Sequence, residues 1–377
     1  LPSVPKSLGR LSDVFISALG SITGKNNRLA LPRARSACVV LVDGLGSANL
    51  RYRAGHANFL ANQLAVDGSI LCGFPSTTVA SLVSFSTGTS AGQHGMVGYQ
   101  VYSRDRGENV NLLTGIGTAA DAKRWQSQQT ISEVAAEQNV SCYFIGPAEY
   151  RDSGFTHATM RSATYVAAKS IEDRVVAAQK ILNSRESALV YLYVPELDQK
   201  AHAFGSKSGE WVQKLEDLDL AVRQLTKALP ANVGVLLTAD HGIVDVAADR
   251  QVYLDELHLD GLISVGGDPR VLFLYFDTTS ADNHLGLQVE RLKSFLNRRA
   301  YVATRDEIIS AGWYGPVTDE AKQRMPDVFL IANGETALYH RDFAKAKSLQ
   351  MVGQHGAVSD DELFVPLLRF GAYRKNS

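Results

Sequence analysis

Short apolar runs recur along the chain and alternate with longer amphipathic segments. The runs lie at residues 37–42, 140–146, 188–194, 233–238, 271–276 and 327–332. They are apolar at consecutive positions, which is typical of strands covered on both faces. Between them, apolar residues recur with helical spacing at 58–66, 130–137, 171–182, 211–228 and 285–297. This alternation predicts an α/β fold with a central, mostly parallel sheet flanked by crossover helices.

The segment from residue 246 to 325 carries strand, helix and turn signals but no run of acids and histidines like those described below. We therefore expect a core formed by residues 30–245 and 326–377, and a small inserted α/β lobe of residues 246–325 that caps it. The run at 327–332 is expected to return the chain to the core. A chain of 377 residues is long enough for one core plus one smaller unit.

Composition and charge exclude several kinds of partner. Hydrophobic residues make up 45% of the chain, charged residues 20%, and the formal net charge is −1. Lysine and arginine are scattered, so we expect no nucleic-acid surface. No apolar run approaches the roughly 18–20 residues of a membrane-spanning helix, so no membrane span is expected. Nothing in the sequence indicates the oligomeric state.

The three cysteines, Cys38, Cys72 and Cys142, all lie in apolar stretches. An odd number in such surroundings indicates buried free thiols, which suit a reducing compartment. No signal-peptide pattern opens the chain, and we expect a cytoplasmic protein. The numbering starts at Leu1 and not at a methionine, so removal of a leader stays open.

Acids and histidines follow three of the predicted strands directly. Asp43 follows the run at 37–42, Asp198 follows 188–194, and Asp240 with His241 follows 233–238. Since the carboxyl ends of parallel strands meet at one edge of a sheet, these side chains are expected to lie close together. Taken singly, an Asp-Gly pair such as Asp43-Gly44 is more often a simple turn. An adjacent acid and histidine at a buried edge are costly unless something binds them.

Two further histidines complete a candidate set of metal ligands. Asp198 and His202 are four residues apart, so both side chains point the same way from one helical turn, although such a pair is also common at surfaces. His355 lies between Gly353 and Gly356. Carboxylate and imidazole together suit zinc or a similar divalent ion.

A group of hydroxyls precedes a predicted helix at residues 79–86. Ser76, Thr77 and Thr78 follow Phe74-Pro75 and can cap the helix. A hydroxyl at a helix N-terminus also lies in a partial positive potential, which favours an alkoxide and an incoming phosphate. No lysine or arginine occurs at residues 54–103, so an anion bound here needs a cation from elsewhere.

Together these motifs resemble the nucleotide pyrophosphatase/phosphodiesterase family of the alkaline phosphatase superfamily, over residues 37–368. The resemblance implies an alkaline-phosphatase-like core. It implies one metal held by Asp198, His202 and His355. It implies a second metal held by Asp43, Asp240 and His241, with Thr78 as the nucleophile that bridges towards it. Two Zn²⁺ ions are expected, and Mn²⁺ suits the same ligands.

The implied activity is hydrolysis of a phosphodiester or pyrophosphate bond through a covalent phospho-threonine, with a small-molecule phosphodiester or nucleotide as substrate. The family carries an asparagine shortly after a His-Gly pair, and Tyr99 stands at that position here, after His94-Gly95. Its phenol could donate the corresponding hydrogen bond. His94 itself is expected either to support the site from behind the ligands or to be structural. No arginine adjoins Thr78, which favours diesters over monoesters.

Two alternatives stay open. The same site could hydrolyse phosphonates or phosphomonoesters, as in other branches of the superfamily. The fold could also serve a non-catalytic, ligand-binding protein, although a complete set of metal ligands argues against that.

Overall fold

The structure is a computed structural model that describes residues 1–5, 9–277 and 285–375. Its largest sheet has six strands in the order β18-β8-β1-β7-β5-β6. Five strands are parallel, and β18 pairs antiparallel with β8 at one edge. The predicted α/β fold with a mostly parallel central sheet is therefore confirmed. The six strands are β1 (Ser36–Val42), β5 (Ser141–Gly146), β6 (Thr164–Ala167), β7 (Ala188–Val194), β8 (Val233–Ala239) and β18 (Leu368–Gly371).

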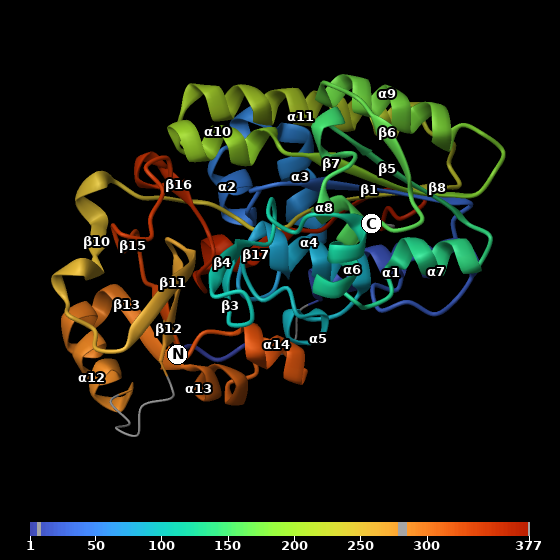
Figure 1. Ribbon diagram of the computed structural model, residues 1–377. Helices are drawn as coiled ribbons and strands as arrows, with labels where there is room; N and C mark the ends of the chain where they lie inside the picture. The colour runs from blue at the N-terminus through green and yellow to red at the C-terminus, as the bar shows by residue number, and fades with distance from the viewer. Residues whose placement is uncertain (6–8, 278–284, 376–377) are drawn as a thin grey trace.

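Helices cover both faces of this sheet. Figure 1 shows α9 (Ile171–Leu182) and α11 (Gly209–Ala228) along one face, and α1 (Val14–Thr23), α4 (Thr78–Thr87) and α7 (Ile131–Glu137) along the other. The segments predicted as helices at 58–66, 130–137, 171–182, 211–228 and 285–297 are all helical. Since helices cover both faces, the central strands β1, β7 and β8 are buried along their whole length.

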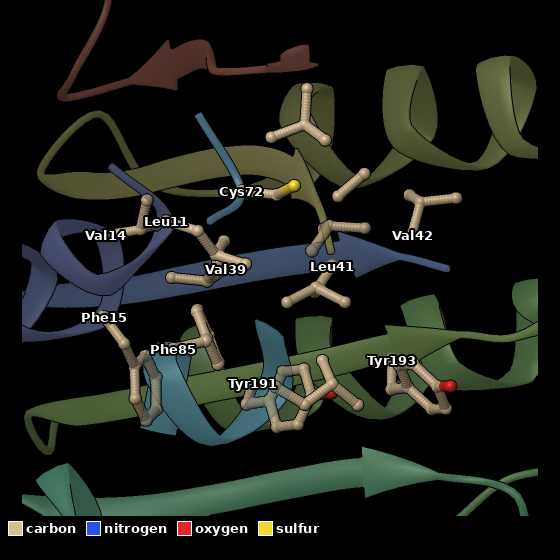
Figure 2. Packing of buried hydrophobic residues seen from close by; sticks show 14 of the residues in the cluster. Leu11, Val14, Phe15, Val39, Leu41, Val42, Cys72, Phe85, Tyr191 and Tyr193 are labelled. Carbon is tan, nitrogen blue, oxygen red and sulfur yellow. The ribbon is translucent and has the colours of Figure 1, made fainter. Parts of the chain in front are cut away.

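Aromatic rings fill the space between the sheet and α4. Phe15 of α1 stacks on Phe85 of α4 with ring centroids 4.7 Å apart, and Phe85 lies 5.1 Å from Tyr191 of β7. Figure 2 shows the rings of Phe15, Phe85 and Tyr191, with Tyr193 further along β7. This packing fixes α4, and with it Thr78 at the start of the helix, against the central strands.

A second sheet has four antiparallel strands in the order β11-β12-β14-β13. They are β11 (Leu262–Asp268), β12 (Val271–Phe276), β13 (Ala300–Thr304) and β14 (Val328–Ala332). The expectation that residues 327–332 form one of the parallel strands is wrong, because β14 pairs antiparallel with β12 and β13 in this second sheet. The boundaries proposed for the core and the lobe stay a prediction.

β12 and β14 are buried on both faces, which explains the error. Phe273 and Phe329 pack into the large core cluster, whereas Leu274 and Leu330 pack under α12 (Leu285–Leu296) in a cluster of their own. A strand covered on both faces reads as a continuous apolar run whether its sheet is parallel or antiparallel.

The remaining helices and strands complete the fold. The remaining α-helices are α2 (Ser47–Tyr52), α3 (Asn58–Asp67), α5 (Ala91–His94), α6 (Ala119–Trp125), α8 (Gly154–Thr159), α10 (Glu196–Phe204), α13 (Arg305–Ser310), α14 (Asp319–Arg324) and α15 (Asp360–Leu363). The remaining strands are β2 (Ser69–Leu71), β3 (Gln100–Ser103), β4 (Glu108–Asn111), β9 (Val244–Asp245), β10 (Gln251–Tyr253), β15 (Ala337–Tyr339), β16 (Gly353–Gln354) and β17 (Phe364–Pro366).

Two further expectations concern the thiols and the membrane. Cys38, Cys72 and Cys142 are buried and free, as predicted. Over the described part of the chain, no helix combines the length and the apolar character that a membrane crossing requires.

Candidate metal centre

The carboxyl ends of three neighbouring strands bring the predicted acids together. Val42 of β1 lies opposite Val194 of β7 and Ala239 of β8, so the three strands end side by side. Asp43 and Asp240 follow β1 and β8 directly, and Asp198 lies in the first turn of α10 after β7. The chain at Gly44 has a positive φ of 72°, and a Cβ there would lie 3.0 Å from Cβ of Asp198. Only glycine lets the two segments approach this closely.

One group of candidate ligands contains Asp198, His202 and His355, with ligand atoms all within 4.8 Å of one another. The Nε2 atom of His202 lies 3.1 Å from Oδ2 of Asp198, and Nε2 of His355 lies 4.0 Å from Oδ1 of the same carboxylate. The structure thus gathers the three residues that the family resemblance implies for one metal.

A second group contains Asp43, Asp198 and His241. Nε2 of His241 lies 3.2 Å from Oδ1 of Asp43 and 3.6 Å from Oδ2 of Asp240. The resemblance implies Asp240 and not Asp198 in this group. Asp240 instead accepts hydrogen bonds through Oδ1 from the backbone N–H groups of Gly44 and His241, at 3.1 and 3.0 Å. Asp198 therefore belongs to both groups, and Asp240 lies beside the second group.

The three imidazoles present the same nitrogen to these carboxylates. Nδ1 donates to a backbone carbonyl in each ring: His202 to Gly353 at 2.7 Å, His241 to Gly242 at 3.2 Å, and His355 to Ser76 at 3.0 Å. A proton on Nδ1 leaves the lone pair of the neutral imidazole on Nε2. Backbone carbonyls in this role are common behind metal-ligating histidines, since they fix both tautomer and ring orientation.

Buried carboxylate oxygens in this cluster lack hydrogen-bond donors. Within the described residues, Oδ1 of Asp43, Oδ1 of Asp198 and Oδ2 of Asp240 are buried and accept no hydrogen bond. The other oxygen of Asp43, Oδ2, accepts a hydrogen bond from the phenol of Tyr193. Buried anionic oxygens without a hydrogen-bond donor are costly, and a metal cation between them would offset that cost. Oxygen and imidazole donors fit zinc or a similar divalent ion.

The pKa values of the cluster reflect this excess of negative charge. Burial and the charge of Asp43 raise the pKa of Asp240 well above its ordinary value. Burial lowers the pKa of His241, but the charges of Asp240 and Asp43 outweigh it and raise that pKa to about 10. Burial and the charge of His241 lower the pKa of His355. Without metal, the positive charge of His241 thus offsets the carboxylates.

Thr78 lies at the edge of this cluster, where α4 begins. Its Oγ1 is 3.2 Å from Nε2 of His241. Thr77 precedes the helix in extended conformation, and its Oγ1 caps none of the N–H groups among the residues described. Ser76 ties this segment to the loop of His355, since its Oγ donates to the carbonyl of Ala357 at 2.7 Å. The N-terminus of α4 therefore faces the cluster with its N–H groups open to an anion.

Tyr99 and His94 occupy different environments. Tyr99 lines the same cavity as Thr78, and burial raises the pKa of its phenol. His94 is buried away from the cluster, where its ring bonds to Oγ of Ser84 at 3.0 Å and to the backbone N–H of Met96 at 3.2 Å. Its environment suits a structural histidine.

The cluster opens into a cavity of about 770 Å³ between the two sheets. Asp43, Thr78 and Asp198 line it from the six-stranded sheet and its helices. From the other side, Asp268 at the end of β11 lines it, as do side chains of the segment 338–351. Asp268 carries no recognisable signal in the sequence, because a single acid before Pro269 resembles an ordinary turn residue.

An α/β fold that gathers carboxylates and imidazoles at adjacent strand ends, beside a hydroxyl at a helix N-terminus, has the components of a metal-dependent hydrolase. Comparison with known proteins agrees with this class. The family model for type I phosphodiesterase/nucleotide pyrophosphatase matches residues 37–358. The chain belongs to this family.

Similar curated proteins include snake-venom enzymes. Venom phosphodiesterase 2 of Crotalus adamanteus is 25% identical over 210 residues, which cover 52% of this chain and 25% of that protein. The venom phosphodiesterase of Naja atra matches with the same identity and coverage. The match thus spans about a quarter of the length of these relatives.

Solved structures of ectonucleotide pyrophosphatase/phosphodiesterase 5 share the fold. The murine protein has a TM-score of 0.69 at 18% identity, covering 89% of this chain and 88% of that one. The human protein has a TM-score of 0.66 at 18% identity, with 90% of each chain covered. At this level of identity the likeness establishes the alkaline-phosphatase-like fold that the sequence predicts.

Proposed function

We propose that the chain hydrolyses phosphodiester or pyrophosphate bonds at a two-metal site with Thr78 as the nucleophile. The observation that carries this proposal is the position of Thr78 Oγ1, 3.2 Å from His241 Nε2, at the open N-terminus of α4. A hydroxyl so placed faces the ligand cluster and the helix dipole together.

Two divalent ions fit the donor set. Asp198, His202 and His355 would hold one, and Asp43 with His241 and either Asp198 or Asp240 would hold the other. When bound, such ions supply positive charge that lowers the pKa of hydroxyl groups and offsets negative charge on a phosphoryl group. Zn²⁺ and Mn²⁺ both suit these ligands.

The residues of the chain then perform two displacements. Thr78 Oγ1 releases its proton to solvent and forms a bond to phosphorus, while the bond from phosphorus to the leaving oxygen breaks and that oxygen keeps the electron pair. The N–H groups in the first turn of α4 stabilise the phosphoryl oxygens meanwhile. In the second displacement, a water oxygen bonds to phosphorus, the bond to Oγ1 breaks, and Thr78 regains a proton.

Tyr99 is proposed to assist by donating a hydrogen bond to a phosphoryl oxygen. Burial keeps its phenol protonated, because it raises the pKa above the ordinary value. A neutral phenol is a donor at any pH near neutrality.

The proposed substrate is a small-molecule phosphodiester or nucleotide. In support, the venom relatives are named phosphodiesterases, and a murine neighbour was solved as an inactive threonine-to-alanine variant in complex with AMP. Phosphonates and phosphomonoesters are the alternative substrates. Turnover of bis-p-nitrophenyl phosphate, p-nitrophenyl phosphate and a p-nitrophenyl phosphonate ranks them, and a monoester preference would refute the assignment to diesters.

Replacement of the nucleophile tests the mechanism. Thr78→Ala should lower kcat for bis-p-nitrophenyl phosphate by about 10³-fold or more with metal still bound, and Thr78→Ser should keep part of the activity. Thr87→Ala, at the far end of the same helix, is the matched control and should behave like the unmodified protein. Unchanged turnover in Thr78→Ala would exclude Thr78 as the nucleophile.

Metal analysis separates enzyme from binding protein. The proposal predicts about two divalent ions per chain and loss of turnover with a chelator. Less than about one ion per chain, not restored by added zinc or manganese, would favour the non-catalytic alternative.

A further inference from the structure

Asp268 is an acid of the second sheet that faces the cavity above the candidate metal centre. It ends β11, and the two-residue turn Pro269-Arg270 leads directly into β12, where Val271 pairs with Asp268. A Cβ added at Gly356 would lie 3.6 Å from Cβ of Asp268. Asp268 therefore lies against the loop that carries His355, although its own strand belongs to the other sheet.

The turn that carries Asp268 is held rigidly. The guanidinium of Arg270 forms a fully buried, two-pronged ion pair with Glu362, with Nε–Oε1 at 3.0 Å and Nη2–Oε2 at 2.7 Å. The carbonyl of Pro269 accepts a hydrogen bond from the N–H of Leu338 at 2.7 Å. A side chain on such a turn is held in place before any ligand arrives.

The carboxylate of Asp268 nevertheless lacks a donor. The residue is partly exposed to the cavity, but its Oδ2 atom is buried and accepts no hydrogen bond from any residue the structure describes. Neither group of candidate metal ligands includes it, as far as the described chain shows. Burial raises the pKa of Asp268 to about 7, although the charges of His202 and His241 act to lower it. A carboxylate that is held rigidly beside the candidate metal centre and lacks a protein donor can accept a hydrogen bond from a bound ligand.

We propose that Asp268 determines substrate specificity by accepting a hydrogen bond from an ammonium or hydroxyl group near the phosphorus atom of the substrate. This inference rests on the proposed function. The same carboxylate repels a second anionic group at that position, so it disfavours substrates with an additional phosphate there. The substrate class is thus a phosphodiester that bears a hydrogen-bond donor on one of its esterified groups.

A matched series of substrates tests this assignment. Ethyl, 2-hydroxyethyl, 2-aminoethyl and carboxymethyl p-nitrophenyl phosphates share the leaving group and differ in one terminal group. The unmodified protein should turn over the aminoethyl and hydroxyethyl esters with a kcat/KM about 10-fold or more above that of the ethyl ester, and the carboxymethyl ester most slowly.

Asp268→Asn should remove the preference for the aminoethyl ester, raise kcat/KM for the carboxymethyl ester, and change the ethyl ester by less than about threefold. Glu149→Gln is the matched control, because Glu149 is another acid lining the cavity but lies in the 3-10 helix after β5. Glu149→Gln should leave the order of kcat/KM among the four esters unchanged. Two results would overturn the assignment. One is an equal loss of kcat/KM for all four esters in Asp268→Asn, and the other is the same change in the order of the four esters in Glu149→Gln.

Two measurements separate this inference from the proposed function. Metal-dependent turnover of the ethyl ester tests the function alone, since that ester carries no donor. Calorimetric binding of 2-aminoethyl phosphate against ethyl phosphate tests Asp268 without turnover, and equal affinities in the unmodified protein would contradict the inference. A lower metal content in Asp268→Asn would also overturn it, because Asp268 would then be a metal ligand.

Discussion

The two walls of the cavity differ in how their polar groups are arranged. On the wall formed by the six-stranded sheet, Asp43, Asp240 and His241 follow aligned strand ends, and each imidazole of the candidate metal centre is anchored through Nδ1 to a backbone carbonyl. On the opposite wall, formed by the end of β11 and the segment 338–351, charged groups include Asp268 beside a hairpin turn, and Lys345 and Lys347 before β16. We call the first the reaction wall, because its groups are suited to the proposed reaction. We call the second the recognition wall, because its groups are suited to binding a substrate.

One buried contact joins the two walls. Arg270 of the second sheet pairs with Glu362, and Glu362 also accepts a hydrogen bond from the backbone N–H of Ala357 at 3.0 Å. Ala357 follows the loop of His355. The recognition wall is thus positioned relative to the reaction wall by a charged contact rather than by apolar packing alone.

The largest expected effect lies on the reaction wall. Asp198 belongs to both groups of candidate ligands, so Asp198→Asn should lower metal content in both and reduce turnover by about 10³-fold or more. Asp240→Asn should keep the ion held by Asp198, His202 and His355. Metal analysis of the two variants measures the difference. If only Asp240→Asn lost both ions, the shared position of Asp198 would be refuted.

The next effect concerns the contact between the walls. Glu362→Gln leaves Arg270 buried without its counter-charge, and loss of one partner of a buried ion pair costs about 3–5 kcal/mol. Urea denaturation should show this as a lower free energy of unfolding. The double variant Arg270→Met/Glu362→Leu should be less destabilised than Glu362→Gln. A single variant as stable as the unmodified protein would show that the pair does not join the walls.

A smaller effect is expected for a residue that hydrogen-bonds to a candidate metal ligand. Tyr193 donates to Asp43, so Tyr193→Phe should weaken zinc binding by about 10- to 100-fold. Tyr191→Phe, two residues earlier on β7, is the matched control and should change zinc affinity little. Zinc titration with a competing chelator measures both. Equal affinities in the two variants would exclude this role of Tyr193.

The smallest effect is a dependence of metal affinity on pH. The pKa of His241 is raised to about 10 in the metal-free protein, so its ring is protonated near neutrality and must lose a proton to bind a metal. Metal affinity should therefore rise with pH, about tenfold per pH unit for each proton released. Calorimetry in buffers of different ionisation enthalpy counts the protons. No proton release at pH 7 would contradict this account.

The reaction wall was largely predictable from sequence, and its residues show why. Asp43, Asp198 and Asp240 each follow a buried strand, and parallel strands align their ends, so chain order alone places them together. The spacing of Asp198 and His202 predicts one helical face, and both lie in α10. The family resemblance supplied Thr78 and the pairing of ligands, which spacing alone leaves open.

The recognition wall was not predictable in the same way. β14 is apolar throughout because one face packs into the large core cluster and the other lies under α12, and a strand in a parallel core sheet would show the same pattern. Asp268 reaches the cavity only because β11 and β12 pair across a two-residue turn fixed by Arg270 and Glu362, which are far apart in the chain. Tertiary contacts of this kind leave no local signal.

The decisive measurement is anomalous X-ray diffraction at the zinc absorption edge on crystals of the zinc-loaded protein, because it locates bound zinc itself. We expect two peaks: one among Asp198, His202 and His355, and one beside Asp43 and His241 and next to the Thr78 hydroxyl. Peaks elsewhere, or a map without ordered zinc at these side chains, would contradict this expectation.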